Sequence, residues 1–64
     1  MVEGIVFVIV DKVSDLVVGI LTQLSPIGGY LRTNYDVYHE DAGTNVLVGY
    51  TCTVNQNGTR SYAP

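Results

Sequence analysis

The chain has 64 residues, a formal net charge of −3 and only three basic residues, Lys12, Arg32 and Arg60. This length allows one small domain, whose core rarely contributes more than about 3–5 kcal/mol without further help. The single cysteine, Cys52, excludes an intramolecular disulfide. Three scattered cations are too few to neutralise a nucleic-acid backbone. We therefore expect no nucleic-acid partner, and we expect stabilisation by association with copies of the same chain.

The N-terminal segment 1–25 is strongly apolar and predicts one long helix. Its apolar residues recur at spacings of three and four and cover more than the single face of a surface helix. We expect this helix to pack in the shared core of a homo-oligomer. The predicted oligomer interface consists of Val2, Ile5, Ile9, Val13, Leu16, Val17, Ile20, Leu21 and Leu24.

A second interpretation of the same segment stays open. Residues 5–10 are all β-branched or aromatic, which favours a strand. Ser14 would then cap a shorter helix over 15–24. In both interpretations the helix ends near Ser25, because the following proline disfavours helical geometry in the residue before it. Residues 26–29 then form a Pro/Gly hinge.

Charged residues in the middle of the apolar segment argue against insertion into a bilayer. Asp11, Lys12 and Asp15 lie there, and each costs about 2.5–3.5 kcal/mol at the centre of a membrane. No signal peptide is expected, because Glu3 precedes the apolar run and no small-residue cleavage site follows it. A membrane-active protein is therefore a third, less favoured interpretation, and the sequence predicts no localisation.

Residues 30–64 predict a three-stranded antiparallel β-meander. Stretches rich in Tyr, Thr and Val at 30–40, 46–56 and 59–63 are separated by turn residues. With the N-terminal helix, these strands give an expected α+β fold in a single domain.

The pairing of these strands follows from turn chemistry and side-chain alternation. Asn57-Gly58 predicts a two-residue type I′ turn, which pairs Cys52 with Ala63 and Thr53 with Tyr62. Alternation of apolar residues in the two longer strands predicts three further pairs, which are Tyr35 with Cys52, Val37 with Tyr50, and Tyr38 with Gly49.

The predicted polar face of this sheet is a candidate recognition surface. Its candidate binding residues are Arg32, Tyr38, Arg60 and Tyr62. Tyrosine and arginine are enriched where proteins recognise partners, so a protein or glycan ligand would fit this face. Cross-strand packing explains the same tyrosines.

No motif indicates catalysis, a cofactor or a metal. Cys52 lies on the predicted core face and reads as a small buried hydrophobe. His39, Glu40 and Asp41 are consecutive strand residues that alternate between faces, so they cannot all converge on one ion. The glycosylation sequon that begins at Asn57 is also the turn that the hairpin needs.

The leading functional hypothesis is a structural, self-assembling subunit of a filament, virion or ring. The alternative is a small binding module that uses the tyrosine-rich polar face. In neither hypothesis is the protein an enzyme.

Overall fold

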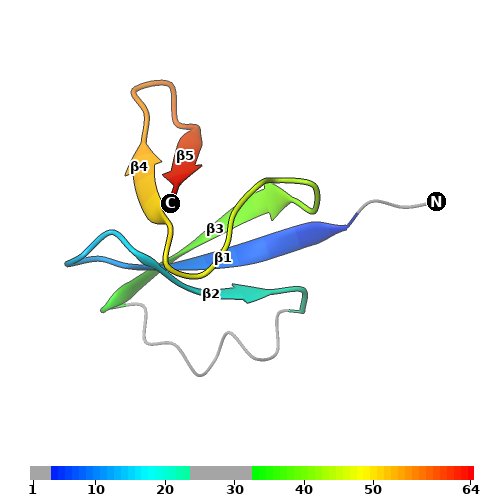
Figure 1. Ribbon diagram of the computed structural model, residues 1–64, viewed down its shortest axis with the longest axis horizontal. Helices are drawn as coiled ribbons and strands as arrows, with labels where there is room; N and C mark the ends of the chain where they lie inside the picture. The colour runs from blue at the N-terminus through cyan, green and yellow to red at the C-terminus, as the bar shows by residue number, and fades with distance from the viewer. Residues whose placement is uncertain (1–3, 24–32) are drawn as a thin grey trace.

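The computed structural model describes residues 4–23 and 33–64, and every regular element in these ranges is a strand (Figure 1). Strands β2, β1 and β3 form one antiparallel sheet in that order, and β4 and β5 form a separate hairpin. The expected α+β class is therefore wrong, and the described chain is all-β with two small antiparallel sheets. The strands are β1 (Ile5–Asp11), β2 (Val17–Leu21), β3 (Tyr35–Asp41), β4 (Thr51–Val54) and β5 (Arg60–Ala63).

The central strand β1 is shielded from water on both faces. Its consecutive residues Val8, Ile9 and Val10 are at most 3% exposed, although successive side chains point to opposite faces. In the sequence, a strand that is buried on both faces is a continuous apolar run without alternation of polar and apolar residues. Such a run also contains apolar residues at helical spacing, so it matches the pattern of a helix equally well. The long helix is therefore wrong over 5–21. The strand interpretation of residues 5–10 is confirmed, whereas the shorter helix is also wrong where it overlaps β2.

The charged residues between β1 and β2 form a turn. The Asp11 carboxylate accepts hydrogen bonds at Oδ1 from the backbone N–H groups of Val13 (2.7 Å) and Ser14 (3.1 Å). Asp15 adopts φ of 60°, a left-handed conformation that Asp tolerates better than most residues. The backbone N–H of Asp11 donates to the Leu16 carbonyl (3.0 Å) and closes the turn. These charges therefore mark a chain reversal rather than the polar side of a helix.

Strand β3 pairs with β1 and not with β4. Tyr38 lies opposite Val8, and Val37 lies opposite Ile9. All three predicted pairs that joined 35–38 to 49–52 are therefore wrong. The predicted strand over 46–56 shortens to β4, because Gly49, at φ of 100°, and the Tyr50 N–H bond to the Leu47 carbonyl (3.1 Å) make residues 47–50 a turn.

The β4–β5 hairpin closes through three loop residues instead of two. A type I′ turn needs positive φ at both central residues. Gly58 has φ of 90°, but Asp15 is the only described non-glycine residue with positive φ, so Asn57 does not qualify. The Gly58 N–H donates to the Asn55 carbonyl (3.0 Å), as in a type I turn followed by a left-handed glycine. The loop residues are therefore 56–58.

The extra loop residue shifts the predicted hairpin register by one. Cys52 lies opposite Tyr62, and Val54 lies opposite Arg60. A one-residue shift moves side chains to the other face of a strand, so Tyr62 joins Cys52 on the inner face of the hairpin. That face packs on the sheet in a small core built from Val8, Val10, Val17, Val46 and Cys52, with Val6, Ile20, Tyr38, Tyr50 and Tyr62 against it.

Replacing Gly58 tests its left-handed conformation in the loop. A Cβ at Gly58 would meet no atom within 4 Å, so Gly58→Ala introduces backbone strain without a clash. We expect Gly58→Ala to lower the free energy of unfolding by about 1–2 kcal/mol, the cost of a left-handed L-residue. Gly43→Ala is the matched control, because Gly43 has equal space and no positive φ. Urea denaturation that finds equal effects for the two variants would contradict the left-handed conformation of Gly58.

Candidate functional site

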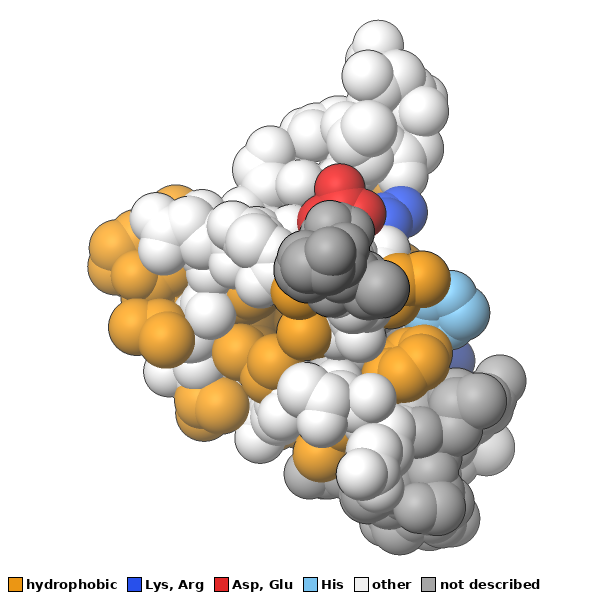
Figure 2. Space-filling model, turned by 90° about the vertical axis from the view of Figure 1, so that its right-hand side faces the viewer, with side chains coloured by type: hydrophobic (Ala, Val, Ile, Leu, Met, Phe, Trp, Pro, Cys, Tyr) orange, Lys and Arg blue, Asp and Glu red, His pale blue; other side chains and the backbone are white. Residues whose placement is uncertain are grey.

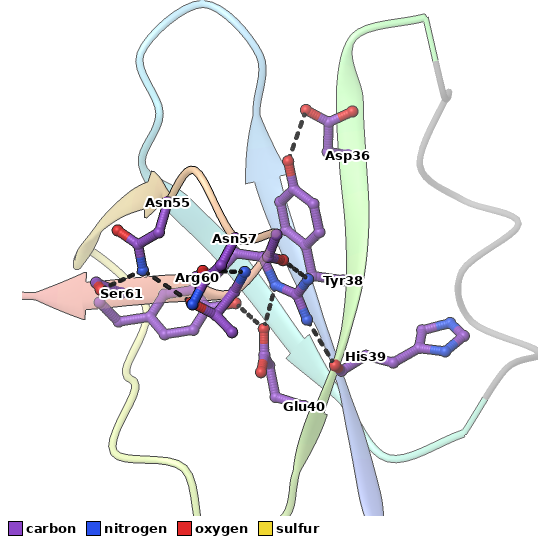
Figure 3. Close-up of polar contacts among 11 residues, drawn as sticks. Asp36, Tyr38, His39, Glu40, Asn55, Asn57, Arg60 and Ser61 are labelled. Carbon is purple, nitrogen blue, oxygen red and sulfur yellow. Dashed lines mark hydrogen bonds and ion pairs between the residues drawn. The ribbon is translucent and has the colours of Figure 1, made fainter.

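The most connected polar side chains of the described residues lie where the β4–β5 hairpin meets β3 (Figure 3). Glu40 of β3 accepts two hydrogen bonds at Oε2, from Arg60 Nε (2.6 Å) and from the Tyr62 hydroxyl (2.7 Å). Both donors come from β5, about twenty residues further along the chain. We call Glu40, Arg60 and Tyr62 the Glu40 cluster, and it fastens the hairpin to the sheet.

The Arg60 guanidinium extends this connection to the backbone. Its Nη2 donates to the His39 carbonyl (3.1 Å), and its Nη1 donates to the Gly58 carbonyl (2.8 Å). The same group lies 5.1 Å from the centroid of the Tyr38 ring, within the range of a cation–π contact. Arg60 therefore joins β3 to the loop that sets the hairpin register.

A second, more exposed set of polar side chains continues along β3. The Tyr38 hydroxyl lies 3.5 Å from Asp36 Oδ2, and Lys12 Nζ lies 3.7 Å from Asp36 Oδ1. Ion pairs in such exposed positions contribute little to stability. The Glu40 cluster is therefore the part of this polar surface that contributes to the stability of the fold.

Burial raises the pKa values of two side chains near this junction, Tyr62 and Cys52. Burial, followed by the hydrogen bond to the Glu40 carboxylate, raises the pKa of Tyr62 above its ordinary value of 10.0. Burial also raises the pKa of Cys52 above 9.0, and the nearby Arg60 offsets only part of that rise. A nucleophilic thiol needs a lowered pKa. Cys52 is therefore a protonated core residue at neutral pH.

The structure brings together three of the four candidate recognition residues. Tyr38, Arg60 and Tyr62 meet at the junction, but their polar groups have intramolecular partners, and both tyrosines pack against the core. Arg32 lies outside the described residues. Ligand binding by this face stays a prediction of the sequence. Sequence reasoning missed Glu40 as the common acceptor, although its position two residues after Tyr38 places it on the same strand face.

The predicted interface residues divide between the interior and the surface of the chain. Ile9 and Val17 are 0% and 1% exposed, so the folded chain itself covers them. Ile20 and Leu21 are half-buried. The residues Ile5, Val13 and Leu16 are exposed, and Val2, Leu24 and the hinge over 26–29 lie outside the described residues. The helix face that was expected to unite these residues does not exist.

The described residues offer no enclosed site for a small ligand. They form no pocket, and they contain no group of three or more His, Cys, Asp or Glu side chains that could hold a metal ion. A search of residues 4–23 and 33–64 also finds no helix long and apolar enough to cross a membrane. Comparisons with protein-family models, with curated proteins and with solved structures find no match to this chain.

Removing the charge of Glu40 should weaken the junction. Glu40→Gln replaces two charge-assisted hydrogen bonds at Oε2 by neutral ones in a partly buried setting, and we expect a loss of about 1–3 kcal/mol in the free energy of unfolding. Asp41→Asn makes the same chemical change at the exposed neighbouring position and should stay within about 0.5 kcal/mol. Equal urea midpoints for the two variants would show that the Glu40 cluster does not fasten the hairpin.

Alkaline pH should also destabilise the fold. The raised pKa values of Cys52 and Tyr62 mean that the unfolded chain releases these protons first as pH rises. The unfolded state then binds fewer protons than the folded state, so stability is full below about pH 9 and falls above it. Urea unfolding across this range measures the slope. Tyr62→Phe should reduce the slope above pH 10, and an unchanged slope would contradict the assignment to Tyr62.

Proposed function

We propose that this chain is a small β-structured subunit that assembles with copies of itself through an apolar surface. The observation that carries this proposal is the distribution of large apolar side chains. Six hydrophobic residues are buried among the described residues, whereas seven large ones are exposed. A monomeric protein rarely leaves a large contiguous apolar patch in water.

Four of the exposed residues belong to two segments that are joined by backbone hydrogen bonds. The Val17 N–H donates to the Tyr50 carbonyl (2.8 Å), and the Gly49 N–H donates to the Val17 carbonyl (2.8 Å). These bonds place the start of β2 beside the turn over 47–50. Figure 2 shows a group of hydrophobic side chains at the left of the view, and others across the middle of the same face. We define the apolar patch as Leu16, Val18, Leu47 and Val48.

A second copy of this chain is a suitable partner for the patch. The patch residues carry no formal charge, so two patches in contact bring apolar side chains together without burying a charge. Its most exposed members are Leu47 (60%) and Val48 (62%). Burying apolar surface contributes about 25 cal/mol per Å², which supplements the small core of a 64-residue chain. Charged residues make up only 14% of the chain. Covering part of its surface with a second copy therefore removes few charges from water, which favours association.

A charge in the patch should weaken assembly. We expect the wild type to exceed the monomer mass in light scattering at roughly 50 µM, because association that contributes about 7 kcal/mol or more is populated there. Leu47→Asp should lower the average mass, since a charge buried at an interface without a partner costs several kcal/mol.

Val54→Asp is the matched control for this measurement. Val54 is 55% exposed, close to Leu47, but it lies on β4 outside the patch. Its variant should keep the wild-type mass, and circular dichroism should show that both variants are folded. A monomeric wild type, or an equal loss of mass in the two variants, would overturn the proposal.

A further inference from the structure

The loop of the β4–β5 hairpin contains a chemically labile pair of residues, Asn57 and Gly58. The chain has four asparagines, and only Asn57 is followed by glycine. Asparagine is a labile side chain, and glycine leaves the backbone nitrogen after it open to approach, because glycine has no side chain of its own. Both residues are exposed to water. Asn57 is therefore the asparagine whose side-chain amide is best placed to be lost.

This loss, deamidation, needs only water besides the chain itself. The Gly58 backbone nitrogen attacks the Asn57 Cγ, and the bond from Cγ to Nδ2 breaks. The proton of the Gly58 N–H leaves with the amide nitrogen as ammonia, and a succinimide ring remains. Water then opens the ring to aspartate or to isoaspartate, depending on which of the two carbonyl carbons it attacks. Either product adds one negative charge to the formal net charge of −3.

Hydrogen bonds of the folded loop hold both reacting groups. The Gly58 N–H donates to the Asn55 carbonyl (3.0 Å), so the proton that must leave is already engaged. The Asn57 Oδ1 accepts from the Thr59 N–H (3.1 Å) and from the Thr59 hydroxyl (2.7 Å). Such a side-chain bond to the backbone two residues on fixes the Asn57 carboxamide in one orientation. The attack requires the proton and the side-chain freedom that these bonds restrict.

The bonds at Asn57 depend on the closed state of the hairpin. The Asn55 N–H donates to the Thr59 carbonyl (2.7 Å), which joins the two strands at the loop. The Asn55 Nδ2 donates to Thr59 Oγ1 (3.1 Å) and to Ser61 Oγ (3.0 Å), and so holds the hydroxyl that contacts Asn57 (Figure 3). Opening the hairpin therefore releases both reacting groups together.

We propose that Asn57 is a deamidation site that the closed β4–β5 hairpin protects, so that modification follows opening of the hairpin. When opening and closing are fast, the rate of such a reaction follows the population of the opened form. The loop over 56–58 shares no residue with the apolar patch. The proposal therefore does not depend on self-assembly.

The two products have different consequences for the hairpin. Aspartate at position 57 keeps oxygen acceptors for the Thr59 N–H and hydroxyl, so the loop can close again. Isoaspartate carries the backbone through Cβ and Cγ and lengthens the loop by one methylene group. Because loop length sets the register that turns Tyr62 to the inner face, isoaspartate opposes closure. An opening event that ends in isoaspartate is therefore not reversed by refolding.

The rate of deamidation in folded and unfolded chain tests the protection. Wild-type protein is incubated in mildly alkaline buffer with and without unfolding urea, and mass spectrometry follows replacement of the Asn57 amide nitrogen by oxygen. A peptide of residues 54–61 in both solutions corrects for the effect of urea on the chemistry. We expect the folded chain to react at least about tenfold more slowly, because the opened hairpin is a minor population.

Thr59→Val tests the contact at the Asn57 side chain. It removes the hydroxyl that donates to Oδ1 and keeps the branched shape, and Thr53→Val makes the same change at an exposed position of β4. In folded protein, confirmed by circular dichroism, Thr59→Val should deamidate several times faster than Thr53→Val, and in urea the two rates should agree. Equal corrected rates for folded and unfolded wild type, or equal rates for the two folded variants, would overturn the proposal. The wild-type comparison stands by itself if Thr59→Val does not fold.

Discussion

The three-residue loop over 56–58 is the constraint on which the arrangement of this small protein depends. Because the loop has three residues, Cys52 pairs with Tyr62, and both side chains point to the inner face of the hairpin. With a two-residue loop, Tyr62 would point to solvent, and its hydroxyl could not reach Glu40. One residue of loop length thus decides whether the hairpin has an apolar face to pack on the sheet.

The Glu40 cluster adds polar contacts to a small apolar core between the hairpin and the sheet. The buried residues are mostly valines, which bring limited apolar area into the interior. The carboxylate of Glu40 gathers one arginine and one tyrosine donor from β5, and Arg60 in turn reaches the His39 carbonyl. Charge-assisted hydrogen bonds in a partly buried setting are among the stronger polar contacts. Packing and polar contacts therefore hold the same junction.

The proposed interface arises from apolar side chains that the fold leaves in water. The apolar patch lies where β2 meets the turn over 47–50, and its four residues are exposed although the small core is close by in the chain. Burying these side chains against a second copy would add apolar area that the interior of a 64-residue chain does not provide.

Local chemistry by itself determined the chain reversal near Asn57-Gly58 and the burial of Cys52, and it offered a strand over residues 5–10 only as the second interpretation. β-Branched residues favour extended backbone, and Asn57-Gly58 marks a chain reversal in any context. The sequence also pointed to Tyr38, Arg60 and Tyr62 as residues that belong together, although for a different reason. Tertiary structure alone decided that β1 is a central strand, because an apolar run buried on both faces has no alternation that separates it from a helix. It also decided the loop length at Gly58 and the meeting of Glu40 with β5, since both depend on which strand packs beside which, and that choice is made by contacts between residues far apart in the chain.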